Sequence, residues 1–288
     1  MADGFLNRVK RMFKLISPQY QKLILDYPVQ FRPRYGYGKS PHVELFNLIK
    51  NQERTYILML NKILKYREVF CGIQIDSKKV NSTLPVWNNG YLPGLDMMIL
   101  YTIISEFKPN VYFEVGSGNS TKLVHLAKTD QKLATKLISV DPLPRVEIDQ
   151  IVDEVIRSPF EDTDFESLFR LGENDILFID NSHRILPNSD SMVFYLEVLP
   201  KLKKGVIVHL HDIYLPYDYP QFMCDRFYSE QYGLAIHLLA NPKKYELIFP
   251  SYFISNENHL ACMLDSLWQE KPLNQVEKHG GSFWFRIL

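Results

Sequence analysis

Two short segments carry the carboxylate and imidazole side chains best suited to chemistry. Asp180 and His183 stand three apart in IDNSH, and His209, His211 and Asp212 follow one another closely in VHLHDI. Carboxylate and imidazole ligands together suit a divalent cation, and a histidine beside a carboxylate suits general-base catalysis. For His209 a buried role in the core is the favoured interpretation. Asp180, His183 and Asp212 are expected to meet, because the carboxyl ends of adjacent parallel strands share one sheet edge.

A glycine-rich segment, EVGSGNS, is a candidate site for a nucleotide-like ligand. Gly116 and Gly118 let the backbone approach a ligand closely, and the helix expected after them offers free N–H groups. Asp141 follows 25 residues after Gly116, at the end of the next apolar run, where a carboxylate can accept hydrogen bonds from ribose hydroxyls. Thr121 stands where the G-x-G-x-x-G motif of dinucleotide dehydrogenases has its third glycine, so that enzyme class is disfavoured. The pattern favours a nucleoside-type ligand.

Alternating strands and helices are expected to position these residues from Pro109 onward. Apolar, β-branched runs predict strands at Val111–Val115, Leu137–Arg145, Glu154–Phe160, Asp175–His183, Gly205–Ile213, Tyr245–Phe253 and Ser282–Leu288. Helices are predicted at 121–129, around Ile148–Val152, at 191–202 and near Ala261–Trp268. Strand–helix alternation with continuously apolar strands is typical of a parallel sheet covered on both faces.

The first 70 residues are basic and have a helical pattern. They contain 13 Lys and Arg against 5 Asp and Glu, whereas residues 71–288 contain 20 against 28. Apolar residues three and four apart predict helices at Leu6–Ile16 and from about His42 to Phe70, separated by FRPRYGYGKSP. Basic amphipathic helices can lie on acidic membranes. The acidic remainder favours instead packing on the body of the protein or on a second subunit.

The composition of the chain excludes several protein classes. Its formal net charge is +0, which argues against a nucleic-acid binder, and 46% hydrophobic residues are enough for a core. No apolar run reaches the roughly 18–20 residues that a membrane span requires. The three cysteines form no disulfide framework or zinc motif. We expect a soluble, cytoplasmic protein without an integral membrane span.

Several longer segments resemble a family of bacterial class I S-adenosylmethionine-dependent methyltransferases, related to macrocin-type sugar O-methyltransferases and cephalosporin-hydroxylase-like proteins. The long HDIYLPYDYP run is the most specific of them. The matching segments are WNNGYLPGLD, FEVGSGNSTK, SVDPLPRVEID, ILFIDNSHR, the stretch from NSDSMVFYLEVLPKLKKG to HDIYLPYDYP, RFYSEQY and GGSFWFR. The resemblance implies a Rossmann-like, doubly wound, mostly parallel seven-stranded sheet. It assigns residues 81–288 to the methyltransferase domain and residues 1–80 to a helical extension, a lid or a dimer contact.

The resemblance also implies S-adenosylmethionine as cofactor. Glu114, Gly116 and Gly118 are then expected at its methionine part and Asp141 at its ribose, with Phe160 and Glu161 near the adenine. The full expected cofactor set is Glu114, Gly116, Ser117, Gly118, Asn119, Asp141, Phe160, Glu161 and Asp180.

A divalent metal, Mg or Mn, is the second implied ligand. Asp180 and Asp212 match the metal-binding carboxylates of the sugar-methylating relatives, whereas His211 stands where an acidic ligand is usual. We expect Asp180, His211 and Asp212 as the metal ligands and His183 with Asp180 as the catalytic pair.

The expected function is O-methylation of a hydroxyl on a small molecule or sugar. The methyl sulfonium is already activated, so the protein has to orient the reactants and assist removal of the hydroxyl proton. A metal-dependent oxygenase of the cephalosporin-hydroxylase-like type, or a cofactor-binding protein without transferase activity, are the alternatives. The expected partners are the acceptor and, in a homo-oligomer, further copies of the chain.

Overall fold

The computed structural model describes residues 13, 17–18, 23–76, 83–144 and 146–288. The chain divides into two compact units, Met1–Arg32 and Pro33–Leu288. The helix expected at Leu6–Ile16 lies outside the described residues except for Phe13. The second unit contains the sheet and all the candidate site residues.

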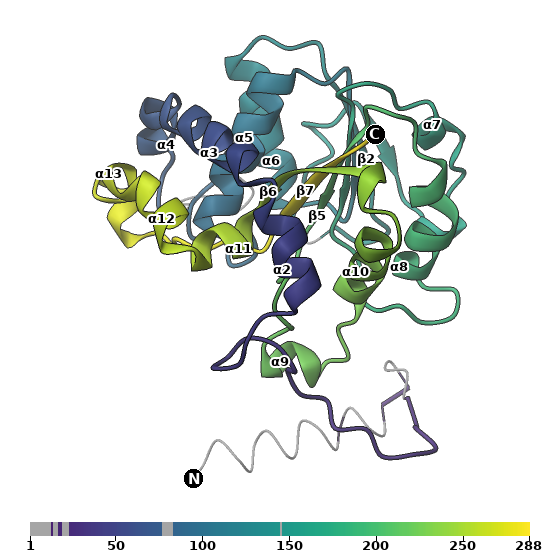
Figure 1. Ribbon diagram of the computed structural model, residues 1–288. Helices are drawn as coiled ribbons and strands as arrows, with labels where there is room; N and C mark the ends of the chain where they lie inside the picture. Colours follow the sequence, from purple (N-terminus) through teal and green to yellow (C-terminus); the bar gives the residue numbers. More distant parts are fainter. Residues whose placement is uncertain (1–12, 14–16, 19–22, 77–82, 145) are drawn as a thin grey trace. The chain divides into compact units, whose positions relative to one another are not determined.

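A seven-stranded sheet forms the centre of the second unit (Figure 1). Its strand order is β3-β2-β1-β4-β5-β7-β6. Strands β1 to β5 are parallel, and β7 is antiparallel to both β5 and β6. The strands are β1 (Val111–Val115), β2 (Lys136–Val140), β3 (Glu154–Ile156), β4 (Ile176–Ile179), β5 (Ile207–Leu210), β6 (Tyr245–Pro250) and β7 (Phe283–Ile287). All seven expected strands are present, and the expected mostly parallel, seven-stranded α/β sheet is confirmed.

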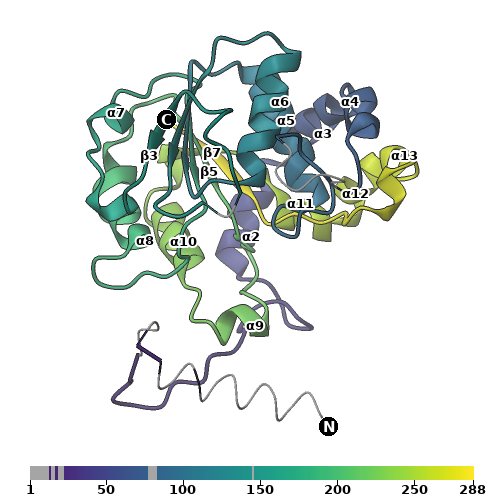
Figure 2. The same cartoon turned by 180° about the vertical axis from the view of Figure 1, so that it is seen from behind.

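Helices cover both faces of the sheet (Figures 1 and 2). Helices α5 and α6 lie on one face with α3 outside them, and α8 and α10 lie on the other. The helices are α2 (Val43–Lys50), α3 (Glu53–Leu64), α4 (Arg67–Gly72), α5 (Gly94–Phe107), α6 (Asn119–Asp130), α7 (Glu166–Phe169), α8 (Asp190–Val193), α9 (Gln221–Cys224), α10 (Glu230–Ala240), α11 (Ser251–Asn256), α12 (Asn258–Ala261) and α13 (Asp265–Trp268). Among the described residues, no helix has the length and apolarity to cross a membrane.

Two expected helices differ in the structure. The helical pattern from His42 to Phe70 forms three helices, α2 to α4, rather than one. No helix forms around Ile148–Val152, where the chain makes turns. Ile148 and Ile151 are both buried. They are three residues apart because a turn, and not a helix, places both side chains in the interior. The apolar period there was a correct signal of burial and a wrong signal of helix.

The strand register brings the candidate site together. Val115 at the end of β1 pairs with Val140 of β2 and with Ile179 of β4, and Ile179 pairs with Leu210 of β5. The residues that follow these strands therefore leave the sheet side by side. This row is Gly116, Asp141, Asp180 and His211.

Candidate active site

A cavity of about 330 Å³ opens at the carboxyl ends of β1, β2 and β4. Of the nine expected cofactor residues, eight line this cavity: Gly116, Ser117, Gly118, Asn119, Asp141, Phe160, Glu161 and Asp180. The third strand was expected to extend to Phe160, but β3 ends at Ile156. Phe160 and Glu161 reach the cavity from a short 3₁₀ turn instead. The cavity is where a doubly wound sheet binds its ligand.

Gly116 allows two strand ends to come close together. Its φ is +82°, and a Cβ at this position would collide with the carbonyl oxygen of Asp180. Asp180 N donates to Val115 O at 2.9 Å, so the two segments are also hydrogen-bonded. The glycine is required by this close approach and by its positive φ.

Asp141 fastens the glycine-rich loop to the end of β2. Its carboxylate accepts hydrogen bonds from Ser117 N at 2.9 Å and from Leu143 N at 2.8 Å. The side chain thus stands at the cavity wall with both oxygens oriented by backbone N–H groups. A carboxylate fixed in this way is preorganised to accept hydrogen bonds from a diol.

Glu114 does not line the cavity. Its carboxylate is buried, accepting hydrogen bonds from Ser120 Oγ at 2.5 Å, from Tyr112 OH at 3.3 Å and from the Thr121 hydroxyl. Burial raises the pKa of Glu114 to about 7. Glu114 therefore fixes the start of α6, and through it the shape of the glycine-rich loop.

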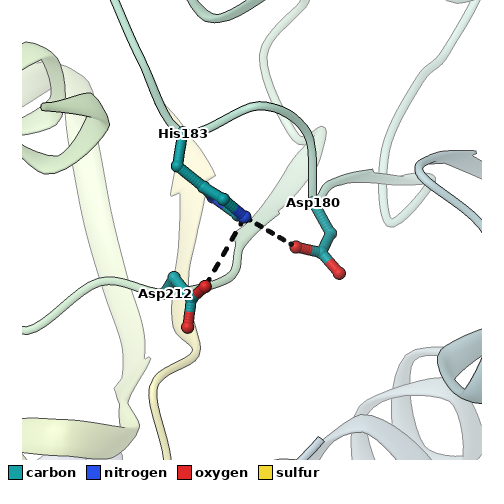
Figure 3. Close-up of side chains that lie close together, drawn as sticks. All are labelled: Asp180, His183 and Asp212. Carbon is teal, nitrogen blue, oxygen red and sulfur yellow. Dashed lines mark ion pairs between the residues drawn. The ribbon is translucent and has the colours of Figure 1, made fainter. Parts of the chain in front are cut away.

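Asp180, His183 and Asp212 converge as expected from their strand ends (Figure 3). His183 Nε2 lies 3.5 Å from Asp180 Oδ1 and 3.5 Å from Asp212 Oδ2. One potential ligand atom from each residue lies within 4.8 Å of the others. His183 and Asp212 both have positive φ, +61° and +56°, so the chain turns sharply at each to present its side chain. Left-handed backbone at non-glycine residues is often associated with functional sites.

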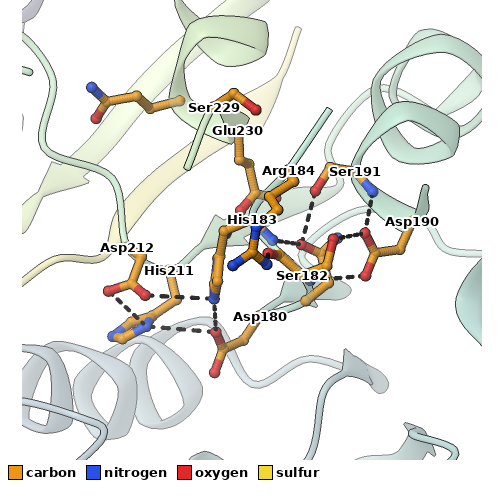
Figure 4. A network of polar contacts seen from close by, with 12 residues as sticks. Asp180, Ser182, His183, Arg184, Asp190, Ser191, His211, Asp212, Ser229 and Glu230 are labelled. Atoms are coloured by element: carbon orange, nitrogen blue, oxygen red, sulfur yellow. Dashed lines mark hydrogen bonds and ion pairs between the residues drawn. The ribbon is translucent and has the colours of Figure 1, made fainter. Parts of the chain in front are cut away.

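Glu230, which the sequence analysis missed, binds the other side of the His183 ring (Figure 4). His183 Nδ1 is 3.0 Å from Glu230 Oε2, and Glu230 is 0% exposed. Burial raises the pKa of the Glu230 carboxyl. Burial also opposes charge on His183, but the Glu230 hydrogen bond and the facing aspartates outweigh it and raise the pKa of His183. Glu230 begins α10, far along the chain, and no spacing pattern connects it to His183.

His211 is held differently from the other site residues. Its Nε2 is 3.5 Å from the buried Asp96 carboxylate, while its Nδ1 lies 3.7 Å from Asp180 and 3.8 Å from Asp212. Burial opposes its charge, but the Asp180 and Asp96 contacts raise the pKa of His211 well above its ordinary value. The group of potential ligand atoms that lie within 4.8 Å of one another contains His183 and not His211, so the metal-ligand role of His211 stays a prediction.

His209 belongs to the core, in agreement with the interpretation favoured from the sequence. Its ring stacks between Phe178 at 4.2 Å and Trp284 at 3.7 Å, and its Nε2 lies 2.7 Å from Ser282 Oγ. Burial holds the pKa of His209 well below its ordinary value.

Part of the chain matches a known protein family. Residues 113–213 match a family described as a methyltransferase domain. The matched segment spans about a third of the chain. It contains both the glycine-rich loop and the Asp180–His183–Asp212 cluster. The match agrees with the expectation that the protein is a methyltransferase.

Solved methyltransferases are similar at low identity. A Podospora anserina methyltransferase, PaMTH1, bound to S-adenosylhomocysteine is 14% identical, covering 79% of this chain and 88% of its own, with a TM-score of 0.41. The plantazolicin methyltransferase BpumL with S-adenosylhomocysteine is 13% identical, covering 80% and 98%, with a TM-score of 0.42. A putative methyltransferase from Thermobifida fusca is 14% identical, covering 69% and 84%, with a TM-score of 0.40. No curated protein sequence matches the chain.

The chemistry of the cluster in the methyltransferase domain fits a divalent cation. Two carboxylates and one imidazole present their ligand atoms to a common point. A carboxylate behind the ring, here Glu230 on Nδ1, is the usual support of a metal-bound histidine because it fixes the tautomer. The set holds one histidine and two carboxylates, whereas iron oxygenases typically use two histidines and one carboxylate. The donor set thus favours Mg or Mn over iron.

Proposed function

We propose that the protein transfers the methyl group of S-adenosylmethionine to a hydroxyl oxygen of a small molecule, with His183 as general base. The observation that carries the proposal is the orientation of the His183 ring. Nδ1 is bound by Glu230, which leaves Nε2 directed at the cluster beside the cofactor cavity. An imidazole fixed by a buried carboxylate is a suitable proton acceptor.

The cofactor is bound along the strand ends. Asp141 accepts hydrogen bonds from the ribose hydroxyls, and the loop from Gly116 to Asn119 surrounds the methionine part. Phe160 and Glu161 form the wall at the adenine, on the far side of Asp141. Each of these residues lines the one cavity at the strand ends, which supports a single extended cofactor site.

The transfer itself needs little from the protein beyond orientation and proton removal. The acceptor oxygen forms a bond to the methyl carbon as the carbon–sulfur bond breaks, and S-adenosylhomocysteine leaves. The hydroxyl proton passes to His183 Nε2. The carboxylates of Asp180 and Asp212, 3.5 Å from that nitrogen, stabilise the imidazolium that forms.

A divalent cation held by the same three residues is the alternative to a histidine base. Asp180, Asp212 and His183 Nε2 would hold it, and it would lower the pKa of a bound hydroxyl. His183 Nε2 is then a ligand and not the base, since Nδ1 is already bound to Glu230. The two mechanisms are therefore mutually exclusive and can be separated by metal removal.

Calorimetric titration with S-adenosylhomocysteine tests the cofactor site. The wild type is expected to bind at micromolar concentration, on the order of −8 kcal/mol, and Asp141→Ala to weaken binding at least tenfold. Asp265→Ala is the matched control, because Asp265 is exposed on α13. If the wild type does not bind, the methyltransferase proposal is wrong.

Titration with Mn²⁺ or Mg²⁺ tests the metal. If the cluster holds a cation, the wild type gives a saturable signal that Asp212→Asn abolishes, and chelation stops methyl transfer. If methyl transfer continues in the presence of a chelator, His183 acts as the base without metal. Iron content with oxygen-dependent turnover would instead support the oxygenase alternative.

A further inference from the structure

The aromatic ring of Tyr228 connects the base to two arginines. Tyr228 stacks on the His183 imidazole, with ring centroids 4.8 Å apart and an angle of 23° between the planes. The guanidinium carbon of Arg226 lies 4.7 Å from the centre of the same tyrosine ring, and that of Arg184 lies 5.3 Å from it. Two cations are thus placed one aromatic ring away from the proposed proton acceptor.

The segment that carries these arginines is fastened to the base. Arg184 Nε donates to Arg226 O and its Nη1 donates to Ser182 O, both at 2.8 Å. Ser229 N and Glu230 N donate to the carbonyl oxygen of His183 at 2.9 and 3.2 Å. The Arg184 side chain and the Arg226 backbone therefore keep a fixed position relative to His183, as a substrate-orienting site requires.

No carboxylate neutralises these two arginines within the described part of the chain. Each guanidinium contacts the Tyr228 ring, but neither has an ion pair with Asp or Glu, whereas Arg67, Arg157 and Arg286 each do. The nearby Asp180 and Asp212 carboxylates face His183 instead. Two guanidinium groups held against one ring repel each other, and an anion between or beside them would relieve that repulsion.

We propose that Arg184 and Arg226 bind an acidic group of the methyl acceptor, so that the acceptor is a hydroxyl compound with a carboxylate or a phosphate. A planar guanidinium binds either group through paired N–H donors. Arg226 is the more available of the two, because it is exposed and its side chain donates no hydrogen bond to any residue that the structure describes. The inference rests on the proposed function, because it assumes that methyl transfer takes place beside His183.

Binding of three matched probes tests the inference. Glucose, glucuronate and glucose 6-phosphate share a hydroxylated ring and differ in the acidic group. Each is titrated calorimetrically into the full-length protein saturated with S-adenosylhomocysteine. At least one acidic probe is expected to bind at least tenfold more tightly than glucose, and the one that does identifies carboxylate or phosphate as the group recognised.

Arg226→Gln is the decisive variant. It is expected to weaken binding of the acidic probe at least tenfold and to leave S-adenosylhomocysteine binding and the midpoint of thermal unfolding unchanged. Arg226→Lys keeps the charge and loses the planar guanidinium. Its affinity for the acidic probe is expected to lie between those of the wild type and Arg226→Gln. Arg170→Gln, at an exposed arginine on the α7 side of the sheet, should behave as wild type.

Two results would overturn the inference. One is that neither acidic probe binds more tightly than glucose, and the other is that Arg226→Gln binds the acidic probe as the wild type does. Failure of the proposed function has a different signature, namely loss of S-adenosylhomocysteine binding by the wild type. The probes are then titrated into the protein alone, and the effect of Arg226→Gln still decides whether the arginines bind an anion.

Discussion

His183 and Glu230 are 47 positions apart in the chain and lie 3.0 Å apart, Nδ1 to Oε2, in a buried contact. The pair fixes which nitrogen of the ring faces the cluster. Oε1 of Glu230 has no hydrogen-bond partner among the described residues, so the carboxylate is held at this depth mainly by the histidine. Burying a carboxylate is costly unless it is paired. The contact thus has a specific role that an apolar residue could not fill.

Replacing Glu230 with glutamine should lower kcat about 10²-fold or more with little change in the KM for S-adenosylmethionine. The amide can donate to Nδ1, which favours the tautomer with the proton on Nε2 and blocks proton acceptance. Nitrogen NMR of the His183 ring reports the tautomer independently of activity. A wild-type ring protonated on Nε2, or a variant with an unchanged tautomer and unchanged kcat, would contradict this role.

Replacing His183 with glutamine should lower kcat about 10²–10⁴-fold, the usual contribution of a general base, and leave S-adenosylhomocysteine binding intact. The raised pKa of His183 also sets the pH dependence. The base acts only when unprotonated, so the rate in metal-free buffer should rise with pH and reach half its maximum above pH 6.5, the ordinary value. The variant should lack this rise. A profile that is flat from pH 6 to 9 in the wild type would exclude His183 as the base.

Gly116→Ala and Gly118→Ala form a matched pair. At Gly116 a methyl group would collide with the Asp180 carbonyl, and the φ of +82° is unfavourable for alanine. The variant should therefore lose about 2 kcal/mol or more of unfolding free energy, and it should no longer bind the cofactor. At Gly118 the nearest atom to a new Cβ is Val146 Cγ2 at 3.6 Å, an ordinary contact, and φ is 172°. That variant should remain folded. Chemical denaturation of both proteins measures the difference.

Glu114 should make the protein less stable as the pH rises. Its pKa is raised from 4.5 to about 7 by burial, so the folded state holds this proton more tightly than the unfolded state does. The stability it contributes is complete below pH 4.5 and is lost as the pH rises to about 7. Glu114→Gln should remove this dependence, and its unfolding free energy relative to wild type should increase between pH 5 and 8 by on the order of 3 kcal/mol. Urea unfolding at several pH values would show whether that difference is present.

The sequence determined most of the fold, because strand periodicity and turn residues are local signals. All seven strands follow from apolar runs of β-branched residues, and the strand–helix alternation specified a sheet with the loops at one edge. It also identified Gly116, Gly118, Asp141 and Asp180, which follow strands, whereas the other four cavity residues in the expected set came from the family resemblance. The helix expected around Ile148 was wrong because two buried residues three apart occur in a turn as well as in a helix.

Only the tertiary structure decided how the site residues pair. Glu230 reaches His183 from the start of α10, Asp96 reaches His211 from α5, and Arg226 and Arg184 share Tyr228. None of these contacts has a fixed spacing in the sequence, because they depend on how separate helices pack on the sheet. For the same reason Glu114, which the motif placed at the ligand, lies behind the loop as its hydrogen-bonded support. Spacing along the chain could identify the residues at the sheet edge, whereas packing determined which atoms of those residues remain available for chemistry.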